Sequence, residues 1–353
     1  MPEDICHSKP FIDEEDNKAV DQQISSGFHA SASKTLEFEN EFLKYIGTKY
    51  AKAVNSGTYA LHLALLGLGV KLGDEVILPS FVCQAVLNAV NYTEAEPILV
   101  DLSDNYGEEG YNICAEKIKR LISKNTKAII VPHMFGVPAD LDPIIELGIP
   151  IIEDCAQSLG AEYKGKKIGG IGKIGVFSFY ATKVISTGQG GMIVTNSDEI
   201  NEKLNDLTKY DKREKYKIAY NYNLTDIQSS LGLSQLKKIN ELIKRRKEIA
   251  EKYQKNFQSI FKIPKYKEGS FPFRYIIGLE NTNQRNKLQE KLKEKNIISE
   301  KPIFKPLHQY LKMNDSYFKN TTKAYQTALS IPIYPALRDE EVDYIIKSVL
   351  ESY

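Results

Sequence analysis

The sequence predicts an α/β protein in which a large domain holds a mostly parallel sheet between helices and a smaller C-terminal domain is α+β. From about residue 50 to 200, short β-rich runs alternate with helical patterns, which is typical of parallel strands joined by helices. With 353 residues, the chain is long enough to bury one large core and a second, smaller one. We therefore expect a large domain over residues 1–240 and a small domain over residues 241–353.

Local patterns predict the elements of the large domain one after another. A turn at residues 55–57 precedes an apolar helical pattern, and β-branched runs between polar residues indicate strands. The expected helices in this part of the chain cover residues 58–69, 84–91 and 115–123. The expected strands cover residues 75–78, 97–100, 128–131, 150–153 and 191–195.

One long helix is expected over residues 225–257, where apolar side chains recur at helical spacing and Thr225 and Gln228 can form a capping box. Its basic run 244–247 is interpreted as a solvated helix face, because glutamates are interleaved with the cations. The small domain is completed by a strand over 274–279, a helix over 284–294, a loop over 301–308 and a helix over 340–352.

Composition argues against several classes of partner and site. The chain has 47 Lys and Arg against 46 Asp and Glu, so nothing favours a nucleic acid or another polyanion. The cysteines and histidines are dispersed, so we expect neither a metal site nor a disulfide framework. The longest apolar stretch, 59–70, is too short to span a bilayer, and the acidic residues 1–16 do not resemble a signal peptide. We expect a cytoplasmic protein with no membrane contact.

Residues 150–191 carry the strongest chemical signal. Asp154 ends an apolar run, and Ser178, Lys183 and a glycine-rich turn follow it. Pyridoxal phosphate would use each group, because an amine condenses with its aldehyde, a carboxylate holds its pyridine nitrogen protonated and a hydroxyl binds its phosphate. In isolation, Lys183 would be an ordinary solvated lysine, and Asp154 a helix cap or loop acid. Together and in this order, they predict a pyridoxal phosphate site with Lys183 and Asp154 as catalytic residues.

A second signal lies at the turn formed by Ser56, Gly57 and Thr58. Free amides at the start of a helix favour a phosphate group, although an ordinary capped helix also explains these residues. The run 170–175 matches the GxGxxG pattern of dinucleotide sites. A strand-like run follows it, whereas a dinucleotide site requires a helix there, so we interpret it as a glycine-rich turn.

Several segments resemble the DegT/DnrJ/EryC1/StrS family of pyridoxal-phosphate-dependent sugar aminotransferases, within the fold-type I aminotransferases. The resemblance covers nearly the whole chain and rests on segments such as NSGTYALHLAL, LGDEVILPSF, VPHMFGVPADLDPI, IIEDCAQSLGAEYKGKKIGGIGKIGVFSFYATK, TGQGGMIVT and YNYNLTDIQSSLGLSQL. It implies that the large domain binds the cofactor.

The resemblance also implies roles for individual residues. Lys183 is the lysine that bonds the cofactor covalently, and Asp154 is the partner of the pyridine nitrogen. The other implied cofactor contacts are Ala156 and Gln157 at the ring, and Ser56, Gly57, Thr58 and Ser178 at the phosphate. Asn221 is expected to reach the phosphate of a neighbouring subunit, which implies a homodimer with shared active sites. His308 lies where the family has a residue near the substrate.

The chain departs from the family pattern at three places. Cys83 stands at the cofactor-binding position where the family usually has an aromatic residue that stacks on the cofactor ring. Asn223 replaces a usual arginine, and the loop 27–33 lacks a usual glycine before the first long helix. These departures indicate a divergent branch whose substrate differs from the commonest ones.

The resemblance predicts an enzyme that moves an amino group, from glutamate, to a nucleotide-linked keto-sugar in surface-polysaccharide or related amino-sugar biosynthesis. Its cofactor would be pyridoxal 5'-phosphate, with pyridoxamine 5'-phosphate as the intermediate form. Two alternatives stay open, namely a pyridoxal-phosphate-dependent sugar dehydratase of the same family and a non-catalytic pyridoxal-phosphate-binding regulatory protein. The dehydratase branch has a histidine in place of the covalent lysine, so the presence of Lys183 argues against it.

Overall fold

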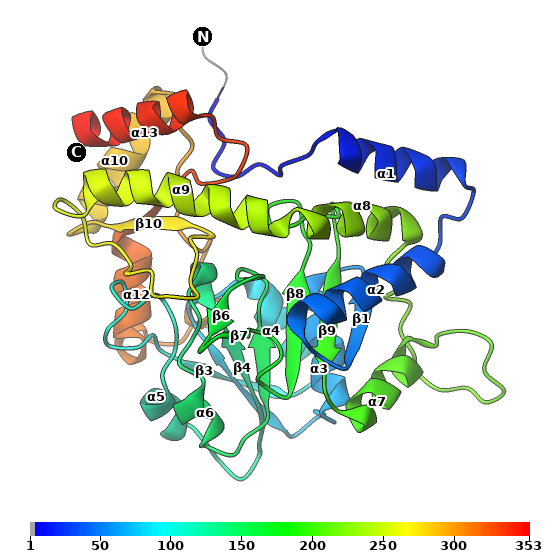
Figure 1. The fold of residues 1–353 in the computed structure, drawn as a ribbon. Helices are drawn as coiled ribbons and strands as arrows, with labels where there is room; N and C mark the ends of the chain where they lie inside the picture. Colours follow the sequence, from blue (N-terminus) through cyan, green and yellow to red (C-terminus); the bar gives the residue numbers. More distant parts are fainter. Residues whose placement is uncertain (1–3) are drawn as a thin grey trace.

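A seven-stranded sheet lies at the centre of the computed structural model, which describes residues 4–353 (Figure 1). Its strand order is β1-β9-β8-β5-β4-β2-β3. The five strands from β8 to β3 run parallel, whereas β9 is antiparallel to both of its neighbours. The predicted α/β class with a mostly parallel sheet is therefore confirmed.

The acidic start of the chain, on which the cytoplasmic prediction partly depends, includes residues 1–3, which lie outside the described residues.

The helices and strands have the following bounds. The strands are β1 Tyr50–Val54, β2 Glu75–Pro79, β3 Glu96–Val100, β4 Thr126–Pro132, β5 Ile151–Asp154, β6 Glu162–Tyr163, β7 Lys166–Lys167, β8 Ile174–Ser178, β9 Gly191–Thr195, β10 Tyr275–Gly278 and β11 Ala328–Ile331. The α-helices are α1 Glu14–Ser25, α2 Ser33–Ile46, α3 Gly57–Gly67, α4 Gln84–Asn91, α5 Ala115–Lys119, α6 Asp142–Ile145, α7 Asp198–Thr208, α8 Asp226–Lys237, α9 Ile239–Phe257, α10 Thr282–Glu294, α11 Leu307–Tyr310, α12 Lys319–Thr327 and α13 Asp339–Ser352. Two 3-10 turns cover Met134–Gly136 and Asp315–Tyr317.

The two faces of the sheet are buried by different helices. Strand side chains alternate between the faces, so Val76 and Leu78 join one hydrophobic cluster and Ile77 joins another. The first cluster includes side chains of α3, α4 and α7. On the opposite face, α5 and α6 pack on β2 and β4, and α2 and α8 pack nearer β9. Helices on both faces explain why the parallel strands are almost wholly apolar.

The expected long helix over 225–257 is wrong in one respect, because the chain forms two helices there. Helix α8 ends at Lys237, and Lys238 has φ −101° and ψ 9°, outside the helical region. The Lys238 amine forms ion pairs with Asp13 and Asp16 at the start of α1, including a contact of 3.1 Å to Asp16. This tertiary contact coincides with the break and is absent from the local sequence pattern. The predicted capping box of Thr225 and Gln228 is confirmed.

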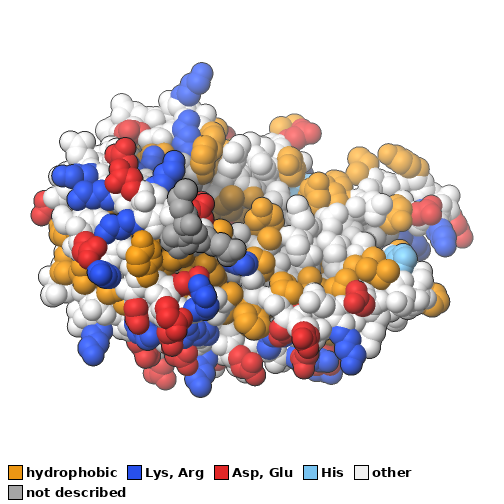
Figure 2. Space-filling model, turned by 90° about the horizontal axis from the view of Figure 1, so that it is seen from above, with side chains coloured by type: hydrophobic (Ala, Val, Ile, Leu, Met, Phe, Trp, Pro, Cys, Tyr) orange, Lys and Arg blue, Asp and Glu red, His pale blue; other side chains and the backbone are white. Residues whose placement is uncertain are grey.

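The basic run at the surface of α9 is only partly solvated. Arg245 forms an ion pair with Asp339 at 2.9 Å, and basic and acidic side chains are intermixed on the face seen in Figure 2. Arg246, however, is only 2% exposed, which corrects the prediction of a solvated face for this residue. Its guanidinium donates to the carbonyls of Phe273 (3.0 Å) and Ile333 (2.9 Å). The helix thus directs one of its four consecutive cations into the core.

One further helix prediction needs correction, and one strand was not predicted. The helix expected over 115–123 is shorter, since α5 ends at Lys119. The C-terminal part contains β11, which the sequence pattern did not reveal and which pairs antiparallel with β10. One hydrophobic cluster gathers Ile5 with residues from 249 to 349, but the C-terminal part also contributes to the clusters around the large sheet. The division at residues 240 and 241 stays a prediction. No helix within residues 4–353 has both the length and the apolar character needed to span a bilayer.

Candidate active site

A cavity of about 220 Å³ lies at the carboxyl ends of the parallel strands. Loops that leave β2, β4, β5 and β8 at this edge supply most of its wall, and the start of α3 supplies the rest. Open α/β sheets bind their ligands at this edge, because the loops that follow parallel strands all meet there. The predicted residues that line the cavity are Ser56, Gly57, Thr58, Cys83, Asp154, Ala156, Gln157, Ser178 and Lys183.

Lys183 lies in the loop after β8, and its backbone is fixed by a hydrogen bond from its amide to the Tyr180 carbonyl (2.8 Å). Its ammonium lies 5.5 Å from the centroid of the Phe273 ring. Burial lowers the pKa of the Lys183 amine; the Asp154 carboxylate opposes this shift and the Arg274 guanidinium adds to it. A lowered pKa increases the neutral fraction of the amine, which is the form that attacks an aldehyde and accepts a proton.

Asp154 is the last residue of β5 and is 7% exposed. Its Oδ1 accepts a hydrogen bond from the Ala156 amide (3.0 Å), and its Oδ2 has no hydrogen-bond partner within residues 4–353. Burial raises the pKa of this carboxyl, although the Ala156 amide and Lys183 favour its charged form. A buried carboxylate with one free oxygen requires a cation. The protonated pyridine nitrogen of pyridoxal phosphate fits this requirement.

The start of α3 forms the end of the cavity that suits a phosphate. Ser56 caps the helix, its hydroxyl accepting from the Tyr59 amide (3.2 Å), and the first amides of the helix have no acceptor within it. The positive end of the helix dipole reinforces this preference for an anion. A Cβ on Gly57 would lie only 2.8 Å from the Ser178 Cβ, so these two residues hold the wall in close packing. The groups present therefore fit the phosphate end of the cofactor.

The remaining predicted ring contacts also lie in this wall. Gln157 is held by a hydrogen bond from the Phe135 amide to its side-chain oxygen (3.2 Å), and Ala156 adjoins Asp154. Cys83 stands at the N-terminal end of α4, is exposed, and lines the cavity. The ring contacts expected of these residues stay predictions, and the structure places all three in the lining of the cavity that also contains Lys183.

Two predicted site residues lie away from this cavity. Asn221 is exposed and lies in the segment before α8. It is next to Tyr222, whose ring stacks on that of Tyr59 with 3.9 Å between the ring centroids. This position, exposed and outside the cavity of its own chain, is compatible with the expected role in a neighbouring subunit. His308 is fully buried, and its ring nitrogens contact the Ser80 hydroxyl (2.6 Å) and the Asp315 carboxylate (3.0 Å). In this structure, His308 therefore links the loop after β2 to the C-terminal part.

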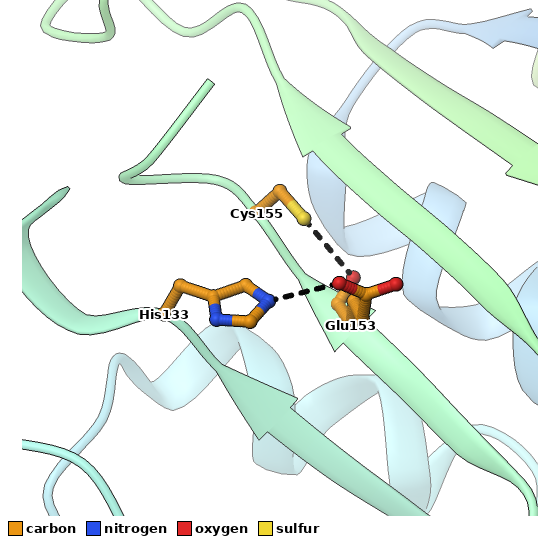
Figure 3. A group of neighbouring side chains, drawn as sticks. All are labelled: His133, Glu153 and Cys155. Carbon is orange, nitrogen blue, oxygen red and sulfur yellow. Dashed lines mark hydrogen bonds and ion pairs between the residues drawn. The ribbon is translucent and has the colours of Figure 1, made fainter. Parts of the chain in front are cut away.

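One group of potential metal ligands comes together beside the cavity, among the described residues (Figure 3). His133, Glu153 and Cys155 place their ligand atoms within 4.8 Å of one another. The His133 Nδ1 accepts from the Ala139 amide (3.0 Å), which leaves the proton on Nε2 facing Glu153 (3.1 Å). Burial raises the pKa of the Cys155 thiol well above its usual range, so the thiolate that a metal needs is disfavoured. The expectation of no metal site stays a prediction.

Glu153 explains the glycine-rich run that imitates a dinucleotide motif. The amides of Gly169 (2.8 Å), Ile171 (2.8 Å) and Gly172 (2.5 Å) all donate to its carboxylate. A Cβ on Gly172 would lie 3.0 Å from the Ile151 carbonyl oxygen. The run then leads into β8, as the sequence predicted. Its amides therefore bind a protein carboxylate, and this contact positions the strand that ends at Ser178.

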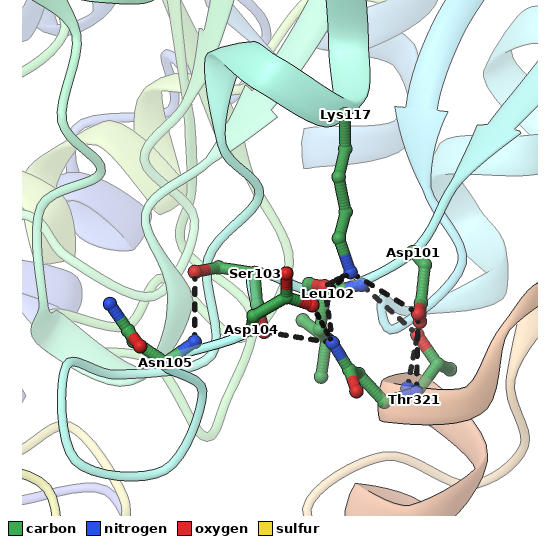
Figure 4. A network of polar contacts seen from close by, with 8 residues as sticks. Asp101, Leu102, Ser103, Asp104, Asn105, Lys117 and Thr321 are labelled. Atoms are coloured by element: carbon green, nitrogen blue, oxygen red, sulfur yellow. Dashed lines mark hydrogen bonds and ion pairs between the residues drawn. The ribbon is translucent and has the colours of Figure 1, made fainter. Parts of the chain in front are cut away.

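A polar network docks the C-terminal part next to the sheet (Figure 4). The Asp101 carboxylate, which follows β3, accepts from the amides of Asn320 (3.1 Å) and Thr321 (2.8 Å) at the start of α12. Lys117 joins the network through Asp101 (3.5 Å) and Asp104 (2.8 Å). These contacts and the His308 link hold the C-terminal part against the strand ends that form the cavity.

The cavity also contains residues that the sequence reasoning missed. Those with polar or aromatic side chains are His133, Tyr180 and Gln189. Gln189 also lines a second, more open cavity, which shares Ser56 and Thr58 with the first. Tyr180 and Gln189 lie on either side of Lys183 in the sequence. The change from apolar to polar residues after β8 could therefore have indicated that they belong to the site. His133 carried no local signal beyond its place after the strand expected over 128–131.

Together, the sheet and the cavity that contains half-buried Lys183 and buried Asp154 define an enzyme of the pyridoxal-phosphate class with an aminotransferase-like fold. The chain belongs to the DegT/DnrJ/EryC1/StrS aminotransferase family, whose pattern matches residues 10–350. It is 35% identical over 368 residues to GDP-perosamine synthase of Escherichia coli O157:H7, with 98% of this chain and 97% of that protein covered. The predicted family is confirmed.

Solved structures agree over nearly the whole chain. The Helicobacter pylori aminotransferase PseC, which is involved in the biosynthesis of pseudoaminic acid, has a TM-score of 0.91, 29% identity and 99% coverage of both chains. The PLP-form of the sugar aminotransferase Spr1654 from Streptococcus pneumoniae has a TM-score of 0.91 and 28% identity, with 98% of this chain and 97% of that chain covered. The predicted fold-type I architecture is thereby confirmed.

Proposed function

We propose that this enzyme transfers an amino group from glutamate to a nucleotide-linked keto-sugar. Its activity as a pyridoxal-phosphate-dependent sugar aminotransferase follows from the family and its relatives, and a similar protein is known in pyridoxal and pyridoxamine phosphate forms. The identity of the donor and the nucleotide is the proposed part. The observation that carries the proposal is the presence of half-buried Lys183 and buried Asp154 in one cavity whose other end is the start of α3.

The residues of the chain divide the work between holding the cofactor and moving protons. When bound, the cofactor supplies an aldehyde for the amino group and a ring that withdraws electrons. Asp154 keeps a proton on the pyridine nitrogen, and the start of α3 with Ser178 binds the phosphate. Lys183 is the one side-chain amine in the lining of the cavity among the described residues, so it takes a proton from the donor carbon and delivers one to the sugar carbon.

Loading with pyridoxal phosphate and mixing with L-glutamate tests the donor half of the reaction. We expect the bound cofactor to become pyridoxamine phosphate, measured by absorbance and by mass after release. Lys183→Ala should retain some cofactor non-covalently and give no conversion, whereas Lys173→Ala, which changes an exposed lysine, should behave as wild type. Turnover by Lys183→Ala, or an unchanged cofactor in wild type with glutamate, would contradict the proposal. GDP- and UDP-linked keto-sugars then identify the acceptor by product mass.

The shared active site of a homodimer is a separate proposal, supported by the position of exposed Asn221 outside the cavity of its own chain. Lys183→Ala and Asn221→Ala should each be inactive alone. Mixed and allowed to exchange subunits, they should regain activity, because one site of the hybrid receives an intact lysine and an intact asparagine. No recovery, with exchange verified by mass, would refute sharing. We also propose a cytoplasmic location, which cell fractionation can check.

A further inference from the structure

The segment 209–225 joins α7 to α8 and carries Asn221, the residue proposed to serve the neighbouring subunit. Part of this segment projects from the body of the molecule (Figure 1). Near its end, Tyr220 and Tyr222 are half-buried, whereas Asn221 between them is exposed. Successive side chains of an extended segment point to opposite sides, which explains this alternation. The two tyrosines therefore face the body of their own chain, and Asn221 faces away from it.

Helix α3 receives both tyrosines on one face. The ring of Tyr222 lies nearly parallel to that of Tyr59, with 3.9 Å between the centroids and 8° between the planes. The centroid of the Tyr220 ring lies 5.1 Å from that of Tyr222 and 5.1 Å from that of His62, which it meets at 77°. Tyr59 and His62 are three residues apart, so they share one face of the helix. Stacked and edge-to-face rings attract one another, so this cluster fixes the segment to α3.

The backbone of the segment is held at the same place. The Asn55 amide donates to the Tyr222 carbonyl (2.8 Å), and Asn223 forms a β-bridge with Val54, the last residue of β1. The Asn221 side chain, in contrast, makes no hydrogen bond to residues 4–353. Asn221 therefore presents a free amide from a backbone that is fixed next to it.

The tyrosine that stacks on Tyr222 belongs to the helix start that suits the cofactor phosphate. Tyr59 is the third residue of α3, and its amide donates to the Ser56 hydroxyl (3.2 Å). Ser56 and Thr58 line the cavity that contains Lys183. The same turn therefore forms one end of the cavity in its own subunit and, through Tyr222, holds the segment that would serve the neighbouring one.

We propose that Tyr59 and Tyr222 are positioning residues that aim Asn221 at the cofactor phosphate of the neighbouring subunit. This inference rests on the proposed shared active site. An asparagine on a free segment would lose conformational freedom on reaching the phosphate, whereas one held by the ring stack loses little, which favours cofactor affinity. The other explanation is that the stack only supports the start of α3 in its own chain. The two explanations differ in which subunit of the dimer is affected when the stack is removed.

Heterodimers with a single Lys183 distinguish these explanations, because only the subunit with this lysine bonds the cofactor covalently. The Lys183→Ala subunit and the lysine-containing subunit carry different affinity tags, so that the mixed dimer can be purified. Tyr222→Ala is placed either in the Lys183→Ala subunit, whose Asn221 would serve the lysine site, or in the lysine-containing subunit itself. In the first placement, the pyridoxal phosphate concentration for half-maximal absorbance of the lysine–cofactor bond should rise about tenfold. In the second placement, it should stay within about twofold of the heterodimer without a tyrosine substitution.

Further variants sharpen this test. Tyr59→Ala removes the other ring of the stack and should act as Tyr222→Ala does, and the two together should add little, because they remove one contact. Tyr222→Phe keeps the ring and should match wild type. Tyr317→Ala, which changes an exposed tyrosine outside the cluster, is the control. Tyr222→Leu, which keeps apolar volume without a stacking face, replaces Tyr222→Ala if that variant does not fold.

The inference is overturned by a loss of affinity in the second placement or by no loss in either, because the stack would then act in its own chain or not at all. Asn221→Ala in the Lys183→Ala subunit checks the shared site itself. If that variant leaves the lysine site unchanged, the shared active site is refuted, whatever the tyrosine variants do. The titration uses pyridoxal phosphate alone, so a failure of wild type with glutamate is a separate outcome.

Discussion

The surroundings of the reacting lysine have two sides of different origin. The wall formed by the large sheet consists of residues that follow strand ends, such as Asp154 and Ser178, together with the start of α3. The opposite side lies beside the cavity and does not line it; its residues Phe273, Arg274 and His308 come from the C-terminal part and approach the site through tertiary contacts. The first side carries the predicted cofactor contacts on residues fixed by strand ends and the start of α3. The second depends on contacts between segments that are distant in sequence.

The largest effect is expected from Asp154→Asn, in the wall of the sheet. An amide cannot hold a proton on the pyridine nitrogen, so proton removal from the donor should slow by about 100- to 1000-fold. Single-turnover conversion with L-glutamate measures this rate. Asp142→Asn, at an exposed aspartate paired with Lys164, should leave the rate unchanged. A wild-type rate for Asp154→Asn would remove the role assigned to this carboxylate.

Glu153→Gln tests the support behind the same wall. Burial raises the pKa of Glu153, but hydrogen bonds from His133, Gly169 and Gly172 outweigh this, so the pKa is lowered overall. The carboxylate therefore contributes stability above its ordinary pKa, 4.5, and this is lost as the pH falls through the lower folded-state pKa. We expect the variant to lose about 3–5 kcal/mol in the free energy of unfolding near pH 7.

Urea unfolding at several pH values measures both parts of this prediction. The stability of wild type should fall below about pH 4.5, and that of Glu153→Gln should depend less on pH there. Equal stabilities at pH 7 would show that the network does not support the wall. Glu241→Gln, at an exposed position of α9, is the matched control.

His308→Ala addresses the other side, which the C-terminal part forms. The ring is buried between Ser80 and Asp315, so its loss leaves the Ser80 hydroxyl with only the amide of residue 308 (3.1 Å) as a partner and should cost about 1–3 kcal/mol of stability. The turnover rate at saturating substrate, kcat, should change little, because His308 does not line the cavity. Thermal unfolding and steady-state kinetics separate these effects. A large loss of turnover with full stability would instead restore the substrate role that the family resemblance implied.

The sequence revealed the site residues that follow the strand ends far better than those of the C-terminal part. Asp154, Ser178 and Lys183 lie within 30 residues of one another, in a pattern that local chemistry explains. The strand order that brings Ser56 to Ser178 was not readable, because β9 inserts between β1 and β8. Arg246 was misjudged because its burial depends on carbonyls at residues 273 and 333. Contacts between distant segments have no local signature, so Arg274 gave no signal.

The smallest effect in this comparison comes from Gly57→Ala, measured against Gly67→Ala in the same helix. A Cβ at Gly57 would lie 2.8 Å from the Ser178 Cβ, so the phosphate end must shift, and cofactor affinity should fall about tenfold. A Cβ at Gly67 meets side chains at 3.5 Å or more, which is ordinary contact, so alanine there should stabilise the helix by about 0.5–1 kcal/mol. Fluorescence titration with pyridoxal phosphate and thermal unfolding measure the two effects. Equal cofactor affinities for both variants would mean that the wall at α3 adapts to added volume, and the rigidity assigned to the sheet side would then be wrong.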